Sequence, residues 1–161
     1  VHPEYVLNEK LPKINTVSDL DEAFWENRFT EINNFEKHLT ENGTIIFKFF
    51  LNIDKEEQKE RLLRRLEEEK HNWKFSPGDL AEREKWNDYM KYYEEAISKT
   101  STDYAPWYII PSNRKEISRY LVSKILLTVM QQFEDIKYPE LDEEIEDNIG
   151  KYKAALLNES K

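Results

Sequence analysis

The middle of the chain concentrates the side chains that are best suited to bind phosphate. The segment from Lys59 to Lys91 contains nine Lys and Arg residues and eight Asp and Glu residues, and its turn Lys70–Lys74 contains no acid. Guanidinium and ammonium groups bind phosphate oxygens through charge-assisted hydrogen bonds. The same composition also fits a solvent-exposed helical hairpin whose charges pair along each helix. The residues alone leave both interpretations open.

Two further groups of polar residues follow apolar runs. Asp54 comes directly after the run Thr44–Ile53, and Ser112–Lys115 come after the run Trp107–Ile110. If both runs are parallel strands, these residues lie at the sheet edge where open α/β proteins bind ligands. Asp54 is explained equally well as the N-cap of the helix that follows it. Ser112–Lys115 are a candidate ligand contact on a loop.

Several classes of active site are disfavoured by what the chain lacks. It contains no Cys, which excludes disulfides, thiolate zinc sites and a Cys nucleophile. Its three His residues lie far apart in sequence, so no metal site is predicted. With only three Gly residues, no glycine-rich phosphate loop can be formed. The carboxylates are so numerous that no acid/base pair can be selected without geometry.

Hydrophobic periodicity predicts a mostly helical α/β chain. The runs Thr44–Ile53 and Trp107–Ile110 are short, apolar and rich in β-branched and aromatic residues, which is typical of buried parallel strands. About fifty residues with two helical patterns separate them, which predicts a βαβ unit whose crossover is a helical hairpin. Two strands make a small sheet, so we expect further segments to cover its apolar faces.

Capping patterns predict where the helices begin. Ser18 is predicted to cap the first helix, with Asp21 at its third position, and Gly43 is predicted to follow its end. Asp54 is predicted to cap the first crossover helix, and Ser76 the second. A further helix is predicted after the second strand, and a last helix or a frayed tail at the end of the chain.

Composition and charge limit the partners. The chain has 161 residues and a net charge of −9, which fits one domain of ordinary size. No apolar run approaches the roughly 20 residues that a membrane span requires. The overall acidity argues against nucleic acid as a partner. The absence of Cys fits a cytoplasmic protein. The opening Val1-His2-Pro3 resembles no translation start, so we expect a piece of a longer polypeptide.

A set of short motifs in residues 1–133 resembles one known family. The motifs are Arg28-Phe29 with Ile32-Asn33 and Phe35-Glu36, Asn42-Gly43-Thr44, Lys48-Phe49-Phe50-Leu51, Lys55-Glu56-Glu57-Gln58, Asn72-Trp73-Lys74-Phe75-Ser76, Asp79-Leu80, Trp86 with Tyr89, Thr100-Ser101-Thr102, and Ala105-Pro106-Trp107-Tyr108 followed by Ile110-Pro111 and Arg114-Lys115. In order and spacing they are similar to the polyphosphate kinase 2 family. The blend is most similar to the branch that phosphorylates nucleoside mono- and diphosphates.

The resemblance implies a P-loop kinase-like α/β fold, related to thymidylate kinase, of which the chain forms the C-terminal half. Residues 1–133 would belong to the kinase domain, with a helical lid at about 54–99 between two parallel core strands. Residues 134–161 would form an acidic C-terminal helix or tail. The family's Walker A and Walker B motifs would lie upstream, so no catalytic residue or metal ligand is implied for this segment. The ligands of Mg²⁺ are expected upstream as well.

The resemblance also implies a function, which is transfer of the terminal phosphoryl group from inorganic polyphosphate to AMP or ADP, or the reverse. Adenine or guanine nucleotides would be substrates, and the protein would be a homo-oligomer. The residues assigned to phosphate binding are Lys74, Arg83, Arg64, Arg65 and Lys70. Those assigned to nucleotide binding are Asn113, Arg114 and Lys115. The alternatives are a catalytically inert helical fragment or interaction module, and an ATP-dependent P-loop nucleoside or nucleotide kinase.

Overall fold

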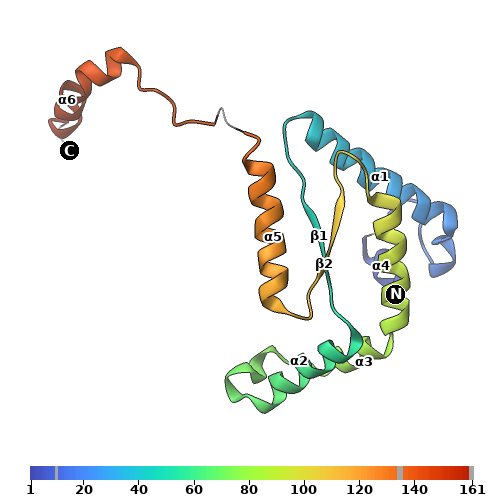
Figure 1. Ribbon diagram of the computed structural model, residues 1–161. Coiled ribbons are helices and arrows are strands. Elements are labelled where there is room, and N and C mark those ends of the chain that lie inside the picture. Colours follow the sequence, from blue (N-terminus) through green and yellow to red (C-terminus); the bar gives the residue numbers. More distant parts are fainter. Residues whose placement is uncertain (10, 134–135, 160–161) are drawn as a thin grey trace. The chain divides into compact units, whose positions relative to one another are not determined.

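The computed structural model describes residues 1–9, 11–133 and 136–159. The chain divides into two compact units, Val1–Ser123 and Lys124–Lys161, and the boundary falls within helix α5 (Lys115–Met130). The two units are described separately below. Figure 1 shows the elements of the first unit around a pair of strands.

The sheet of the first unit has two parallel strands. Strand β1 (Lys48–Asn52) pairs with β2 (Trp107–Pro111) in a register that runs from Lys48 opposite Trp107 to Asn52 opposite Pro111. The predicted parallel pair is therefore confirmed. The ladder is shorter than the apolar run Thr44–Ile53, because β2 offers only five residues for pairing.

The first long helix begins later than its sequence predicts. Helix α1 (Glu22–Glu41) is capped by Asp21, whose Oδ1 accepts a hydrogen bond of 2.8 Å from the Phe24 amide. The prediction that Ser18 caps this helix is wrong. Asp19 accepts hydrogen bonds from the backbone amides of residues 15 and 16 and holds this stretch in a separate 3-10 turn, η2 (Val17–Asp19), which follows η1 (Pro3–Glu9). The predicted end is confirmed, since Gly43 has a φ of +85°.

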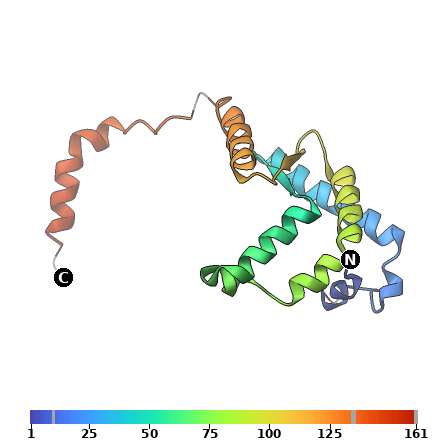
Figure 2. The ribbon, with the colours of Figure 1, turned by 60° about the horizontal axis from the view of Figure 1, so that its bottom comes forward.

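The crossover between the strands consists of four short helical elements. They are α2 (Lys55–Glu67), η3 (Glu69–Lys74), α3 (Gly78–Glu84) and α4 (Trp86–Thr100). Figure 2 shows α2 leaving the end of β1, the chain turning back at η3, and α3 returning to α4.

Asp54 caps α2 as predicted, by accepting a hydrogen bond of 2.7 Å from the Glu57 amide. The prediction of a single helix that begins at Ser76 is wrong, because Lys85 divides this stretch into α3 and α4. The Oγ of Ser76 accepts a hydrogen bond from the Gly78 amide. The Lys85 amide bonds to the Glu82 carbonyl three residues earlier, which closes α3 with a tight turn.

Helices α1 and α4 pack together and contact the two strands. The Phe50 ring of β1 lies 4.9 Å from the Tyr93 ring of α4, and the indole N–H of Trp107 donates to Thr100 Oγ1 at the end of α4. In contrast, Leu51 and Ile109 remain 56% and 57% exposed. Within the described part of the chain, the sheet therefore lacks the cover expected for both of its faces.

The second unit contains the C-terminal half of α5 and helix α6 (Glu143–Leu157). Asp142 caps α6 by accepting a hydrogen bond of 2.9 Å from the Glu144 amide, so a helix forms here rather than a frayed tail. Residues 134–135 and 160–161 of the predicted acidic segment lie outside the described residues. Among the described residues, no helix is long and apolar enough to cross a membrane.

Candidate functional site

A hollow of about 540 Å³ in the first unit is lined almost entirely by charged side chains. We call it the basic hollow. Its lining residues are Arg61, Arg64, Arg65, Glu68, Lys70, His71, Lys74 and Lys115. Helix α2 and the residue after it supply the first four, η3 supplies the next three, and the start of α5 supplies Lys115. Among the described residues that line this space, six are Lys or Arg and one is a carboxylate.

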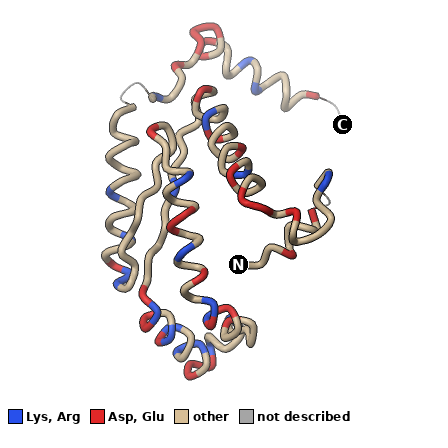
Figure 3. The backbone as a smooth tube through the Cα atoms, turned by 90° about the vertical axis from the view of Figure 1, so that its right-hand side faces the viewer, with Lys and Arg blue, Asp and Glu red and all other residues tan. Residues whose placement is uncertain are grey.

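The crossover mixes both signs of charge, as Figure 3 shows, so the pairing of each cation decides what is left for a ligand. Arg65 is bonded to Asp79 at 3.2 Å, and Lys70 to Glu68 at 3.2 Å. For Arg64, Lys74 and Lys115, no carboxylate of a described residue lies within salt-bridge distance.

Three cations of the hollow are therefore available to an anion without first breaking an ion pair. Lys74 Nζ lies 5.1 Å from the centroid of the Trp73 ring, whose π face attracts a cation weakly. An anionic ligand would compete with this contact. The pKa of Glu68 is lowered, chiefly by the hydrogen bond from Lys70 and also by the positive charges of Lys70 and Arg64, which favours its charged form.

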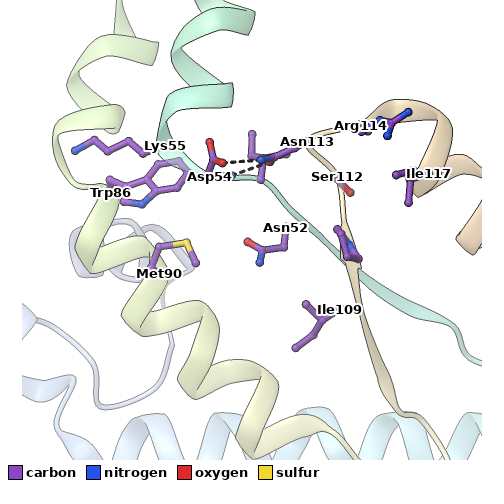
Figure 4. Close-up of a pocket in the computed structure, with 12 residues that line it drawn as sticks. Asn52, Asp54, Lys55, Trp86, Met90, Ile109, Ser112, Asn113, Arg114 and Ile117 are labelled. Atoms are coloured by element: carbon purple, nitrogen blue, oxygen red, sulfur yellow. Dashed lines mark hydrogen bonds between the residues drawn. The ribbon is translucent and has the colours of Figure 1, made fainter.

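A second hollow, of about 560 Å³, lies at the carboxyl ends of the two strands (Figure 4). We call it the strand-end hollow. It is lined by Asn52, Ile53, Asp54, Lys55, Trp86, Met90, Ile109, Pro111, Ser112, Asn113, Arg114 and Ile117. Trp86 and Met90 of α4 and Ile117 of α5 make much of the lining apolar, and polar groups come from the strand ends. The carboxyl edge of a parallel sheet is where open α/β folds bind ligands.

Hydrogen bonds join the loop after β2 to the start of α2. The residues that make them line one or the other of the two hollows. Asn113 Nδ2 donates to Asp54 Oδ2 at 2.6 Å, and Asn113 Oδ1 accepts from the Asp54 amide at 3.0 Å. Arg61 Nη2 donates to the Ser112 carbonyl at 2.6 Å, and its Nε donates to Glu57 at 2.7 Å. Asp54 therefore has a lowered pKa, chiefly because it accepts the Glu57 amide and the Asn113 side chain.

The structure brings together some of the residues assigned from the sequence and separates others. Four of the five predicted phosphate-binding residues line the basic hollow, namely Arg64, Arg65, Lys70 and Lys74. The fifth, Arg83, is not among the lining residues and donates to the Lys55 carbonyl at 2.6 Å and to Gln58 Oε1 at 2.9 Å. Of the three predicted nucleotide-binding residues, Asn113 and Arg114 line the strand-end hollow, and Lys115 lines the basic hollow.

Sequence reasoning missed Arg61 and His71 as lining residues. A signal for Arg61 was present, because it lies three and four residues before Arg64 and Arg65 and therefore shares their face of the helix. His71 lies in the basic turn that the sequence singled out, but nothing in the sequence showed that its side chain borders the same space as Lys115.

The described residues do not fit a resident metal ion. None of their His, Asp and Glu side chains gather in a group of three or more that could hold one. The two carboxylates nearest to the hollows are already engaged, Asp54 by Asn113 and Glu68 by Lys70. The described part of the chain therefore supplies no ligand set for Mg²⁺.

Comparison with known proteins identifies the family. A family model described as polyphosphate kinase 2 matches residues 12–138. The chain belongs to the polyphosphate kinase 2 family. The family predicted from the motifs is thereby confirmed.

Three relatives show how much of a polyphosphate kinase 2 protein the chain represents. The ADP-polyphosphate phosphotransferase of Rhodopseudomonas palustris is 42% identical over 140 residues, which are 87% of this chain and 47% of that protein. The AMP/ADP-polyphosphate phosphotransferase of Meiothermus ruber is 45% identical over 116 residues, 72% of this chain and 43% of that protein. The crystal structure of polyphosphate kinase 2 from Arthrobacter aurescens TC1 matches with a TM-score of 0.73 and 44% identity, over 87% of this chain and 47% of that one. The chain thus spans about half the length of these relatives.

Proposed function

We propose that this chain forms the lid and the last two core strands of a P-loop kinase-like enzyme that transfers a phosphoryl group between polyphosphate and AMP or ADP. The basic hollow carries this proposal, because six cations around one carboxylate form a site for a polyanion. The names of two relatives support the substrates, since the Rhodopseudomonas palustris and Meiothermus ruber proteins are called polyphosphate phosphotransferases. The proposed lid covers about residues 54–99, in a kinase-domain portion of residues 1–133.

In this proposal the protein binds and orients the phosphate chain. Phosphoryl transfer depends mainly on holding the reactants in line and neutralising charge on the phosphate oxygens. Arg64, Lys74 and Lys115 act first, since no ion pair has to be broken before they bind phosphate. Arg65 and Lys70 exchange carboxylate partners for phosphate oxygens. Closure of the lid over the chain of phosphates excludes water and so limits hydrolysis.

The strand-end hollow is the proposed nucleotide site. Its apolar wall, made by Trp86, Met90 and Ile117, suits a nucleobase, and Arg114 supplies positive charge for the nucleotide phosphates. Adenine and guanine would both fit such a wall. Binding of Mg²⁺ elsewhere in the protein, a homo-oligomeric assembly and a cytoplasmic location stay predictions from the family resemblance.

The test is donor-dependent turnover of the purified intact protein. We expect ADP or ATP to form from AMP or ADP with polyphosphate as the sole donor. We expect Lys74→Ala to lower turnover with long polyphosphate by about tenfold or more, the loss of one charge-assisted contact. Lys59→Ala is the matched control, because Lys59 also lies on the lid but pairs with Glu56 outside the hollow.

The alternatives give different results in the same assay. Turnover with ATP but not with polyphosphate would identify an ATP-dependent kinase, and no turnover with any donor would favour an inert interaction module. An equal rate for Lys74→Ala and wild type would remove Lys74 from the site.

A further inference from the structure

The basic hollow is assembled from two separate parts of the chain. Of the described residues that line it, seven belong to the continuous stretch Arg61–Lys74, and Lys115 alone comes from beyond β2. Lys115 belongs to the same hollow only if the loop after β2 is held against α2. The position of that loop therefore decides whether the site is complete.

Asp54 and Asn113 hold the loop through a reciprocal pair of hydrogen bonds. The Asn113 amide donates through Nδ2 to Asp54 Oδ2 at 2.6 Å and accepts through Oδ1 from the Asp54 backbone at 3.0 Å. The second carboxylate oxygen, Oδ1, accepts from the Glu57 amide. Each polar atom of the two side chains thus has a partner, and the loop is joined to the first turn of α2 (Figure 4).

A second contact secures the same junction from the side of the basic hollow. Arg61 Nη2 donates to the Ser112 carbonyl, and the Ser112 amide donates to the Asn52 carbonyl at 2.7 Å. Ser112 itself is buried. The residues that follow, Arg114 and Lys115, line different hollows. Fixing residues 112 and 113 therefore fixes two cations at once.

We propose that Asp54 and Asn113 are positioning residues that set Lys115 in the basic hollow and Arg114 in the strand-end hollow. This inference rests on the proposed function, because it assigns the first hollow to the phosphate donor and the second to the nucleotide. It replaces direct nucleotide contact as the role of Asn113, whose donor and acceptor are both engaged by Asp54. An error of about 1 Å in the placement of reacting groups can lower a rate by about a hundredfold.

Exchanging the two side chains tests the pair. In Asn113→Asp two carboxylates face each other. In Asp54→Asn the new amide at position 54 caps α2 through its oxygen, so its N–H groups point at Asn113. Whichever way the Asn113 amide is turned, one N–H group then faces another N–H group across the pair. The double variant D54N/N113D restores every bond, since the new amide at position 54 still caps α2 through its oxygen and donates to the new carboxylate at position 113. We expect each single change to lower kcat/KM for polyphosphate by about tenfold or more, and the double variant to return within about threefold of wild type.

If Asn113 instead contacts the nucleotide directly, the D54N/N113D double variant should not recover activity. The double variant would then place a carboxylate where an amide had met the nucleotide, so its KM for AMP or ADP would stay high. A double variant that is no better than Asn113→Asp overturns the proposal.

Lys115→Ala separates positioning from a merely structural role. If the pair positions Lys115, this change lowers kcat/KM for polyphosphate by about tenfold in wild type and by less than about twofold in the Asn113→Asp background, where Lys115 is already displaced. If Lys115→Ala lowers kcat/KM by about tenfold in both backgrounds, the positioning role of Asp54 and Asn113 is overturned, whereas the basic hollow remains the proposed site of the phosphate donor. If Lys115→Ala leaves kcat/KM unchanged in wild type, Lys115 does not contact the phosphate donor. That result would count against the proposed function of the hollow.

Discussion

Replacing Lys48 with Met is expected to destabilise the first unit strongly, although Lys48 lies outside both hollows. Its Nζ lies 2.6 Å from Glu36 Oε2 on α1 and 2.6 Å from the Thr100 carbonyl at the end of α4. The Lys48 and Glu36 side chains are only 10% and 13% exposed. The same ammonium group lies 5.4 Å from the centroid of the Trp107 ring. Lys48 therefore joins β1 to α1 and α4.

The size of the effect follows from the burial of the pair. Removing one partner of a buried ion pair leaves an uncompensated charge and typically costs about 3–5 kcal/mol. We take the lower end, about 3 kcal/mol, because each side chain keeps a small exposed fraction through which water can solvate Glu36. For a protein of this size, that loss lowers the melting temperature by roughly 6–12 °C.

Thermal unfolding followed by circular dichroism measures this loss, and two further variants define its origin. Replacing both partners, as in K48M/E36M, should recover much of the stability, because no unpaired charge remains buried. Lys37→Met is the control for charge removal alone. Lys37 pairs with Glu41 at 3.7 Å on the exposed face of the same α1 helix, so the change should cost about 0.5 kcal/mol or less.

Two outcomes would refute this reasoning. One is a Lys48→Met variant as stable as Lys37→Met, which would show that the buried pair contributes no more than a surface pair. The other is a double variant no more stable than Lys48→Met, which would place the cost in the lost bond to Thr100 rather than in the unpaired Glu36 charge.

Two further predictions concern the N-terminal segment and the tip of the crossover, residues 68–77. The pKa of His2 is raised chiefly by its hydrogen bond to Glu82, so its contribution to stability is complete below its ordinary value of 6.5 and is lost as pH rises through the raised value. Melting temperatures measured across this window should therefore fall with rising pH, and equal slopes for wild type and His2→Gln would contradict this. Arg65→Ala should speed limited proteolysis within residues 68–77, because it removes the bond to Asp79, whereas Arg64→Ala should leave the cleavage rate as in wild type. Equal cleavage rates for the two variants would show that the bond does not hold the tip.

Local signals in the sequence were sufficient for much of the fold. The two apolar runs became parallel strands, and Asp54 and Gly43 took the predicted positions at helix ends. The errors arose where two local signals competed. Ser18 and Asp21 are both good N-caps, and the bonds of Asp19 to the preceding backbone decided between them. A choice of this kind depends on neighbouring contacts that composition and spacing do not specify.

In the candidate site, the sequence likewise predicted which cations are present but not which of them line the same hollow. Arg64, Arg65, Lys70 and Lys74 were predicted to act together, and they line one hollow because α2 and η3 are adjacent in the chain. Arg83 has the same chemistry and lies in the same basic segment. Its guanidinium instead bonds to α2, and that contact depends on how α3 packs, which the sequence pattern does not specify.

The cations of the crossover divide according to their partners. Arg61 and Arg83 donate to backbone carbonyls near the base of the crossover, at Ser112 and Lys55. Such bonds have fixed geometry and suit residues that hold elements together. Arg64 and Lys74 both line the basic hollow and have no carboxylate partner among the described residues, so their charges stay available to an anion. This division shows how a chain with a net charge of −9 can keep a locally positive hollow. If the hollow binds phosphate as proposed, the ligand should also stabilise the crossover, because it would offset the like charges that line the hollow.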